Sequence, residues 1–544
     1  MDKRTILAII LSMMVIFIYN LYFVPRQVPK RQLNPAQKTA PAAEKGNYST
    51  PASGADQELT STPSNPAPYR IQAEAPSAGE DIIIDTPLYI ALFSPQGGAL
   101  KSFKLKQYRQ TIKKDSPYIE MVSVQEGMPQ PLTLTFPEST VDIPGNLAFE
   151  ADHKEIKLTG PKQSQSLVFS RTFPGQIKID KIITFYSDQY AFDLDVRVFN
   201  LSPQPINQNA GLAWYQYVDP KAETDRYGHE GPVVYAAENV DRQNVKKLDT
   251  ARSLGPNVAW GGFETKYFLV AMIPQNPSLT SLSMSRDDRN LVSVGLKGPK
   301  DLITRGDSAS FRYTLYLGPK DYNILKAQGA GLENAIDFGS WLKWLAMPLL
   351  FILKFLNRYV HNYGIAIIIL TTLIKIAFWP LGNKSYKSMK EMQKLQPKLR
   401  ELQEKYKDDR ARLSQETMAV YKSHKINPLG GCLPILIQIP VFFGLYKALL
   451  YAIELRHSPF IWWIQDLSAK DPYYISPIIM GATMFLQQRM APPAGDPTQQ
   501  KIMMWMPIIF TFLFVNFPSG LVIYWLFNNI ISIGQQYYIN KRSA

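Results

Sequence analysis

Apolar runs dominate the chain after residue 340 and constrain its fold more than any other feature. They cover about residues 363–381, 430–453, 473–490, 502–517 and 520–539, and a further run from Thr5 to Val24 follows Lys3 and Arg4. A helix of about 20 such residues crosses the hydrocarbon core of a bilayer. Because no small-residue cleavage pattern follows Val24, residues 1–24 are predicted to be an uncleaved anchor. The sequence therefore predicts a polytopic α-helical membrane protein with six spans.

The basic residues predict how these spans are oriented. Segment 384–425 holds twelve Lys and Arg residues against two in 454–472, and the net charge of the chain is +14. Cytoplasmic loops carry an excess of Lys and Arg. Both termini are therefore expected in the cytoplasm, with residues 25–361 on the outer side. No nucleic-acid motif accompanies the charge, so direct nucleic-acid binding is not expected.

The region before the main apolar runs has two different compositions. Residues 25–80 are rich in Pro, Gln, Ala and Ser, which predicts a flexible linker. Residues 81–338 contain short β-branched and aromatic runs between turn residues, such as KIDKIITFYS and AFDLDVRVFNL, which predicts a large all-β sandwich. Its histidines, His153 and His229, have no ligand-spaced partner, and Cys432 is the only cysteine. We expect no metal and no cofactor.

Two helical segments are predicted outside the spans. Residues 339–361 place Lys343, Lys354 and Arg358 on one face among Trp, Leu and Phe, which predicts an amphipathic helix in the membrane interface, interrupted near Pro348. Residues 384–425 show helical periodicity on both sides of a turn at Asp409, which predicts a charged helical hairpin. Residues 362–540 then form a five-span core that includes this hairpin, and 541–544 are a short cytoplasmic tail.

Polar residues lie within the predicted spans. Lys375 follows Thr371 by one helical turn, Gln438 lies between two prolines, and the last span carries Trp525, Asn528, Ser532 and Gln535 on one face. A lysine in mid-span costs roughly 2.5–3.5 kcal/mol, so it should face protein or water. The lysine could instead extend toward the interface, and the polar stripe could simply join helices by hydrogen bonds. Two polar stripes together favour a shared hydrophilic cavity.

Several long motifs resemble one known family. The runs NPLGGCLPILIQIPVFFGLY (427–446), DLSAKDPYYISPIIMGATMF (466–485), DPTQQKIMMWMPIIFTF (496–512) and NFPSGLVIYW (516–525) resemble the YidC-type membrane protein insertases, the bacterial members of the Oxa family. The resemblance covers roughly residues 340–540. The order of anchor, β-domain and five further spans is similar to the Gram-negative form of the family.

The resemblance implies an inner-membrane insertase and chaperone rather than an enzyme. Such a protein passes hydrophobic segments of nascent proteins from the cytoplasm into the membrane through a hydrophilic groove, alone or with the Sec translocon. The β-domain would be a periplasmic supersandwich. The hairpin would meet the ribosome and the signal recognition particle machinery, and membrane lipids would surround the core.

The family's groove residues are carried over one by one. The groove cation corresponds to Lys375, and the groove polar positions correspond to Thr371, Gln438, Asn528 and Ser532. The aromatic pair that contacts substrate corresponds to Tyr524 and Trp525. The family usually has arginine where this chain has Lys375 and a second tyrosine where it has Trp525, and a long basic tail is missing here.

Two other functional classes remain as alternatives. A small-solute transporter would usually carry acidic groups in its spans, and none is found well inside them here. A membrane-anchored envelope protein acting on carbohydrate through the β-domain is the other alternative.

Overall fold

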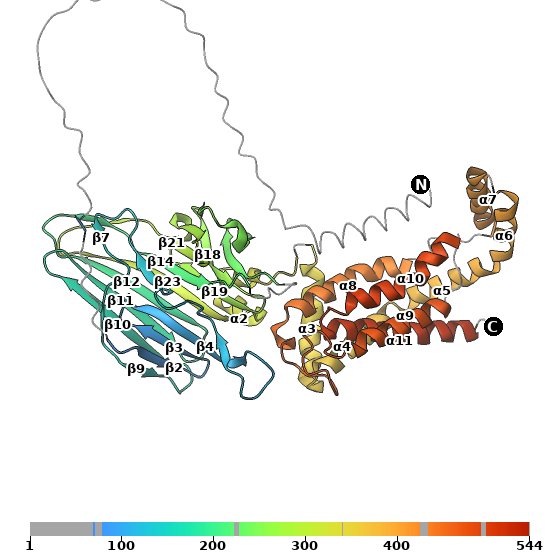
Figure 1. Cartoon of the computed structure of the whole chain (residues 1–544), viewed down its shortest axis with the longest axis horizontal. Coiled ribbons are helices and arrows are strands. Elements are labelled where there is room, and N and C mark those ends of the chain that lie inside the picture. The colour runs from blue at the N-terminus through green and yellow to red at the C-terminus, as the bar shows by residue number, and fades with distance from the viewer. Residues whose placement is uncertain are drawn as a thin grey trace, which may run out of the picture. The chain divides into compact units, whose positions relative to one another are not determined.

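The computed structural model describes residues 69–70, 79–221, 228–339, 341–407, 409–424, 433–490 and 497–542. The predicted anchor 1–24, most of the linker 25–80, the tail residues 543–544 and Cys432 lie outside the described residues. The described chain is β-structure up to residue 319 and mainly helical after it (Figure 1). The predicted division into a β-domain and a helical part is thus confirmed.

The β-domain contains one nine-stranded sheet and two five-stranded sheets in the described part of the chain. The nine-stranded sheet has the order β16 (Asn239–Arg242), β15 (Gly231–Ala236), β18 (Val258–Glu264), β19 (Phe268–Pro274), β23 (Ser308–Pro319), β12 (Ala191–Asn200), β11 (Ile177–Tyr186), β10 (Ser164–Phe173), β8 (Glu150–Ala151). One five-stranded sheet has the order β5 (Tyr118–Glu120), β4 (Ala99–Arg109), β3 (Tyr89–Ser94), β2 (Ile82–Asp85), β9 (Glu155–Lys157). The other has the order β17 (Arg252–Leu254), β20 (Ser281–Arg286), β21 (Leu291–Lys297), β14 (Gly211–Tyr217), β6 (Thr133–Thr135).

Two short pairs complete the β-structure. Strand β13 (Ile206–Gln208) pairs with β22 (Asp301–Ile303), and β1 (Tyr69–Arg70) pairs in parallel with β7 (Val141–Asp142). Strand β1 lies inside the stretch expected to be linker, so part of that stretch is ordered against the β-domain.

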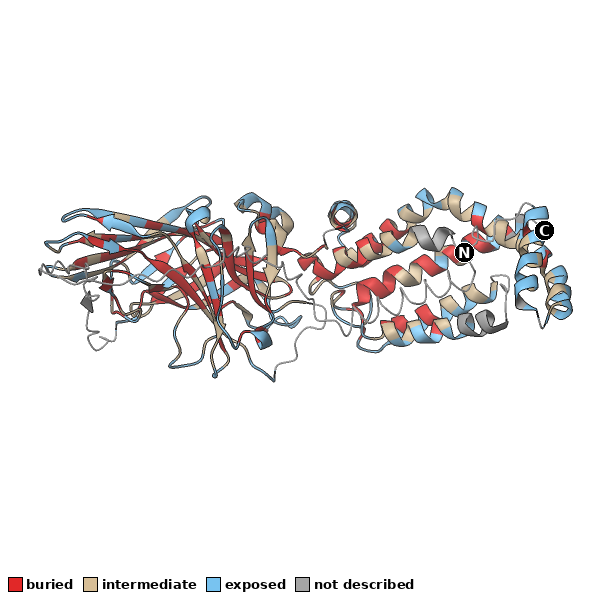
Figure 2. Cartoon of the chain, turned by 90° about the horizontal axis from the view of Figure 1, so that it is seen from above, coloured by how far each residue is buried: buried red, intermediate tan, exposed pale blue. Residues whose placement is uncertain are grey.

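Alternating side chains explain why the sheets stack. In β3 the sequence YIALFS alternates buried and half-buried residues, because successive side chains point to opposite faces of a sheet. Phe93 of β3 contacts Phe185 of β11 at 5.6 Å between ring centroids, and Phe103 of β4 contacts Phe192 of β12 at 6.1 Å. The buried residues form a continuous interior between the sheets (Figure 2). The predicted all-β sandwich is confirmed.

The helices follow the β-domain in chain order. They are α2 (Tyr322–Gln328), η3 (Leu332–Ala335), α3 (Lys343–Val360), α4 (Tyr363–Ala377), α5 (Trp379–Lys394), α6 (Gln396–Lys405), α7 (Arg410–Ser423), α8 (Leu433–Tyr451), η5 (Ile453–Leu455), α9 (Ile475–Met490), α10 (Pro497–Phe514) and α11 (Ser519–Arg542). Helices α6 and α7 lie within segment 384–425, for which a helical hairpin was predicted, and the Asp409 carboxylate caps α7 by accepting from the Arg412 amide at 2.9 Å.

Two helices differ from the sequence prediction. Helix α3 continues through Pro348, where an interruption was expected. The run expected to continue to residue 381 ends at Ala377, and α5 begins at Trp379 after a bend of 63°. Pro380 explains the break, because proline has no N–H and its ring clashes with the carbonyl four residues earlier.

Taken singly, no helix among the described residues has both the length and the apolar composition of a membrane span, whereas the bent pair α4 and α5 has them together.

One core lysine fixes two loops of the β-domain. Lys181 of β11 is fully buried, and its Nζ donates to the carbonyls of Gly98 and Leu132, each at 2.6 Å. Both acceptor residues have positive φ, +53° and +63°, in the turns that precede β4 and β6. Burial lowers the pKa of Lys181 to about 7. The neutral amine has two N–H donors, which matches the two carbonyls.

We expect Lys181→Met to destabilise the β-domain and to change how stability depends on pH. Two buried carbonyls lose their donor, which costs about 2 kcal/mol near pH 7. In the wild type, between about pH 7 and the ordinary lysine pKa of 10.5, the unfolded chain binds a proton that the folded chain does not. The free energy of unfolding should therefore rise with pH across that window in the wild type, and this contribution should be absent from the variant. Denaturant unfolding of the full chain in detergent, followed by circular dichroism, measures both effects. If the free energy of unfolding depended on pH in the same way in wild type and variant, a lowered pKa of Lys181 would be contradicted.

Candidate functional site

Four polar residues from three helices form one hydrogen-bonded group, called here the Lys375 cluster: Lys375 of α4, Gln438 of α8, and Asn528 and Ser532 of α11. The Lys375 Nζ donates to Ser532 Oγ at 2.8 Å and to Gln438 Oε1 at 3.4 Å. Gln438 Nε2 donates to Asn528 Oδ1, and Ser532 Oγ donates to the Asn528 carbonyl at 2.7 Å. The amine is thus directed at α8 and α11, as a cavity between helices requires.

A small cavity lies beside this cluster. Its volume is about 50 Å³, and its lining comes from α4, α5, α8 and α11: Ile374, Lys375, Phe378, Leu381, Gly382, Tyr386, Gln438 and Gln535. A cavity of this size has room for a few water molecules, and Lys375, Gln438 and Gln535 in its lining offer them hydrogen-bond partners. Among the described residues no group of His, Cys, Asp and Glu side chains could hold a metal ion. What the arrangement offers is one cation and amide donors and acceptors.

Thr371 and the aromatic pair lie on the same helices as the Lys375 cluster, and their contacts are these. Thr371 is fully buried, and its hydroxyl donates to the Ile367 carbonyl of its own helix at 2.7 Å. Tyr524 is 1% exposed and stacks on Phe442 at 6.2 Å between ring centroids. Trp525 meets the same ring edge-on at 4.8 Å. In this structure these three side chains pack between helices.

The sequence prediction missed the contribution of α5. Gln535 Nε2 donates to the Trp379 carbonyl at 3.3 Å and to Asn383 Oδ1 at 3.1 Å, so α11 holds α5 in place. Gly382 permits this approach, because a Cβ there would lie 2.7 Å from Gln535 Nε2. Two signals were present in the sequence: the pair Trp379–Pro380, which restarts a helix, and Gln535, which continues the polar stripe by one turn.

At the opposite end of the helices, segment 456–474 ties several helix ends together. Asn362, which caps α4, donates through Nδ2 to the Phe460 carbonyl at 2.9 Å. The Ser519 amide at the start of α11 donates to the Ala469 carbonyl at 2.7 Å. Asp471 is fully buried and accepts from the Ser476 amide at the start of α9 at 2.8 Å. These bonds fix one end of α4, α9 and α11 to a single segment.

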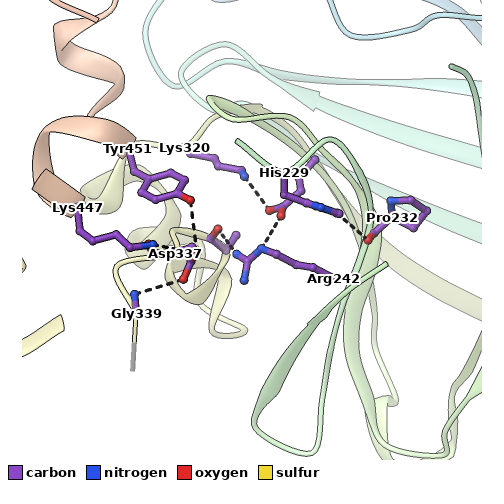
Figure 3. Close-up of polar contacts among 10 residues, drawn as sticks. His229, Pro232, Arg242, Lys320, Asp337, Gly339, Lys447 and Tyr451 are labelled. Atoms are coloured by element: carbon purple, nitrogen blue, oxygen red, sulfur yellow. Dashed lines mark hydrogen bonds and ion pairs between the residues drawn. The ribbon is translucent and has the colours of Figure 1, made fainter. Parts of the chain in front are cut away.

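Ionic contacts join the β-domain to α8, as Figure 3 shows. Asp337, between η3 and α3, accepts from Lys447 Nζ and from the Tyr451 hydroxyl of α8, each at 3.4 Å. Behind it, the buried Glu264 of β18 pairs with Arg242 at 2.6 Å and with Lys320 at 2.7 Å. Burial opposes the charge of Glu264, but Lys320 and Arg242 outweigh it and hold the pKa of this carboxyl below its usual value.

A second ionic contact connects three elements and is called here the Lys354 triad. Lys354 Nζ of α3 lies 3.0 Å from Asp321 Oδ2 and 2.6 Å from Glu454 Oε1 of η5, and all three side chains are at most 22% exposed. Asp321 also caps α2 by accepting from the Asn323 amide at 2.7 Å. Burial raises the pKa of Glu454 although Lys354 opposes it, whereas at Asp321 Lys354 outweighs burial and the pKa is lowered.

The chain is similar to known proteins along its full length. Residues 81–352 match the family "YidC periplasmic domain", and residues 355–544 match the family "60Kd inner membrane protein". The "Membrane protein insertase YidC" of Syntrophus aciditrophicus (strain SB) is 62% identical over 544 residues, which is 100% of both chains. That of Geotalea daltonii is 43% identical over 542 residues, 99% of each chain. The crystal structure of an active YidC insertase with its first transmembrane domain resolved has 21% identity and a TM-score of 0.37, covering 87% of this chain and 95% of that chain.

We expect Lys354→Met to destabilise the full chain by on the order of 3 kcal/mol near neutral pH, because two enclosed carboxylates lose their cation. At lower pH Glu454 takes up a proton more readily, so the loss should shrink between about pH 8 and about pH 5. Chemical unfolding of the protein in detergent at both pH values measures this difference.

Two further variants control this experiment. Lys354→Arg keeps the charge and should stay close to wild type, and the double variant with Glu454→Gln should lose less than Lys354→Met alone. A loss that is equal at both pH values and in the double variant would show that the triad acts by packing and not by charge.

Proposed function

Since the chain belongs to the YidC family of membrane protein insertases, we propose that it moves hydrophobic segments of nascent proteins from the cytoplasm into the inner membrane and assists their folding there. The observation that carries this proposal is the 62% identity over the whole length of a membrane protein insertase. The matching families are described as an inner membrane protein and a periplasmic domain, which supports the same location for this chain.

The proposed topology has six spans, with both termini in the cytoplasm and residues 25–361 in the periplasm. The five spans after the β-domain would comprise α4 with the start of α5, then α8, α9, α10 and α11. Large apolar side chains exposed on α9 and α10 support lipid contact, among them Ile478 (59%), Trp505 (60%) and Phe512 (81%). Helix α3 would lie in the interface, since Trp344 (69%) and Phe355 (55%) are exposed on it.

The Lys375 cluster would be the hydrophilic groove of the insertase. Its amine would attract the polar, often acidic, end of an incoming segment, while the apolar part moves along the lipid-facing side of the helices. The attraction is stronger than in water because the surrounding helices exclude solvent. Ser532 and Gln438 orient the amine and use two of its three N–H donors. No covalent bond is made or broken in this mechanism.

The described conformation is a closed one for such a substrate. A cavity of about 50 Å³ accommodates water but not a peptide segment. The walls formed by α5 and α11 would have to separate before a segment could enter. The two hydrogen bonds from Gln535 to Trp379 and Asn383 are the ones that would open.

The partners beyond the substrate are also proposals. Helices α6 and α7, with the basic residues between 384 and 425, would form the cytoplasmic hairpin that meets the ribosome and the signal recognition particle machinery. The Sec translocon would act with the chain on larger substrates.

We predict that Lys375→Arg supports insertion at close to the wild-type level, because it keeps the charge and its hydrogen-bond acceptors. Lys375→Glu should lower insertion of substrates with acidic periplasmic tails about tenfold, which corresponds to about 1.4 kcal/mol. Protease protection of such a substrate in proteoliposomes measures the inserted fraction. Full insertion by the glutamate variant at equal protein levels would contradict a role for the groove charge.

Crosslinking tests which residues face the substrate. A photo-crosslinker at Phe378, which lines the cavity and is 39% exposed, should capture a stalled nascent membrane protein. The same probe at Thr371, which is fully buried, is the matched control and should capture much less. Equal capture at both positions, or none at Phe378, would place the substrate path elsewhere.

A further inference from the structure

The loop between β4 and β5 presents an apolar side chain on a rigid base. At the base, the Gln110 amide donates to the Pro117 carbonyl at 2.9 Å, and the Thr111 amide donates to Ser116 Oγ at 2.9 Å. Ser116 is buried, whereas Ile112 at the tip is 54% exposed. Hydrogen bonds thus close the base of the loop, and the isoleucine at its tip is exposed.

The tip of this loop is also basic. Ile112 is followed by Lys113 and Lys114, both exposed, and by a single exposed aspartate. Neither lysine forms an ion pair with any residue in the described part of the chain. An apolar side chain can enter a lipid interface, and each lysine near an anionic lipid surface adds to the attraction, so this tip combines both kinds of membrane contact on a small scale.

Arg456 ties this loop to the helical part of the chain. It follows α8 and η5, and its Nη2 donates to the carbonyls of Arg109 at 2.7 Å and Gln110 at 3.2 Å. The guanidinium also lies 5.7 Å from the ring centroid of Phe268. The base of the loop is therefore held at the end of an apolar helix.

The segment that contains Arg456 carries further exposed apolar groups. Ile461 is 45% exposed, Trp462 77% and Tyr473 65%. Trp and Tyr side chains are enriched at the boundary between a membrane and water. The loop and this segment thus present membrane-interface chemistry at one end of the helices.

We propose that the loop 110–117 is a peripheral membrane contact of the β-domain. Ile112 enters the boundary between headgroups and acyl chains of the outer leaflet, and Lys113 and Lys114 bind the phosphates of anionic phospholipids. This proposal rests on the proposed function, because α8 must span the bilayer for the loop to reach its surface. Two lysines and one isoleucine suffice because Arg456 already holds the loop there, which makes the contact intramolecular.

A lipid surface fits the loop better than a protein partner. A stable protein interface buries about 800 Å² on each side, mostly in a contiguous patch. The tip offers one apolar side chain between charged ones. A bilayer surface accepts such a tip without a shaped pocket.

Fluorescence quenching in proteoliposomes tests the contact with the full chain. In a Cys432→Ala background, Ile112→Cys is labelled with an environment-sensitive fluorophore, and quenching by lipids with a spin label near the headgroup is measured. Vesicles contain phosphatidylcholine with phosphatidylglycerol, or phosphatidylcholine alone. We expect a blue-shifted emission and quenching at least about twofold stronger in the anionic vesicles.

Two labelled control positions separate this proposal from the proposed function. Leu302→Cys is the matched control, since Leu302 is 69% exposed but lies far from the loop. The loop follows β4, and Gln107 of β4 accepts from Tyr190, just before the start of β12, at 3.1 Å. Leu302 lies near the other end of β12, where Asn200 donates to the Ile303 carbonyl at 2.9 Å. It should not be quenched. Phe512→Cys on α10 should be quenched by lipids labelled deep in the acyl chain in both vesicle types; if it is not, the proposed spans are wrong.

The same system tests whether the two lysines are needed and whether they bind the phosphate of lipid headgroups or free phosphate. Lys113→Gln with Lys114→Gln should remove the preference for anionic vesicles, and added inorganic phosphate should leave the quenching unchanged. Quenching at position 112 that is no stronger than at 302, while position 512 is quenched, would overturn the proposal. Loss of quenching on adding inorganic phosphate would overturn it too, in favour of a free-anion site.

Discussion

A polar group enclosed by apolar helices has to find its hydrogen-bond partners within the protein, and this requirement organises the helical part of the chain. Lys375 brings α4 against α8 and α11 through Gln438 and Ser532. Gln535 extends the same stripe and binds α5. One face of α11 therefore supplies the partners of three other helices, so the relative positions of these helices depend on a few side chains spaced one turn apart.

Most of the predicted helices and strands were inferred from the periodicity of apolar residues. The alternating strands of the sandwich and the helical runs follow from which residues share a face. The grouping of Lys375, Gln438 and Ser532 was implied by the family resemblance, which the polar stripes of two predicted spans supported. The rotation of each helix about its own axis does not follow, because it depends on packing between segments far apart in the chain. Thr371 and Tyr524 share helices with the cluster but turn into buried contacts. The bend at Phe378 was readable from Pro380, yet its direction and the resulting role of α5 were not.

The junction between the β-domain and the helices shows a second limit of sequence reasoning. The charges of α3 were expected to mark the wet side of an interfacial helix. In the structure Lys354 pairs with Asp321 and Glu454, and Lys343 donates to Asn334 Oδ1 at 3.0 Å. Two of the three charged residues of α3 thus bind protein, whereas Arg358 is exposed, as are Trp344 and Phe355. A periodic pattern identifies the two faces of a helix. Whether a face packs on protein or is exposed depends on which other segments of the chain lie beside it.

The segment 456–474 has a mechanical consequence. It fixes α4, α9 and α11 at one end, so a separation that leaves these bonds intact is a rotation about that end. Helix α11 has 24 residues, so its length is about 36 Å. A rotation of about 10° would move its far end by about 6 Å and its first turn hardly at all, by the same geometry. Lys375, Ser532 and Gln535 lie in the halves of α4 and α11 that are far from this end. Any widening of the cavity that leaves these bonds intact would therefore be largest at the opposite end of the helices.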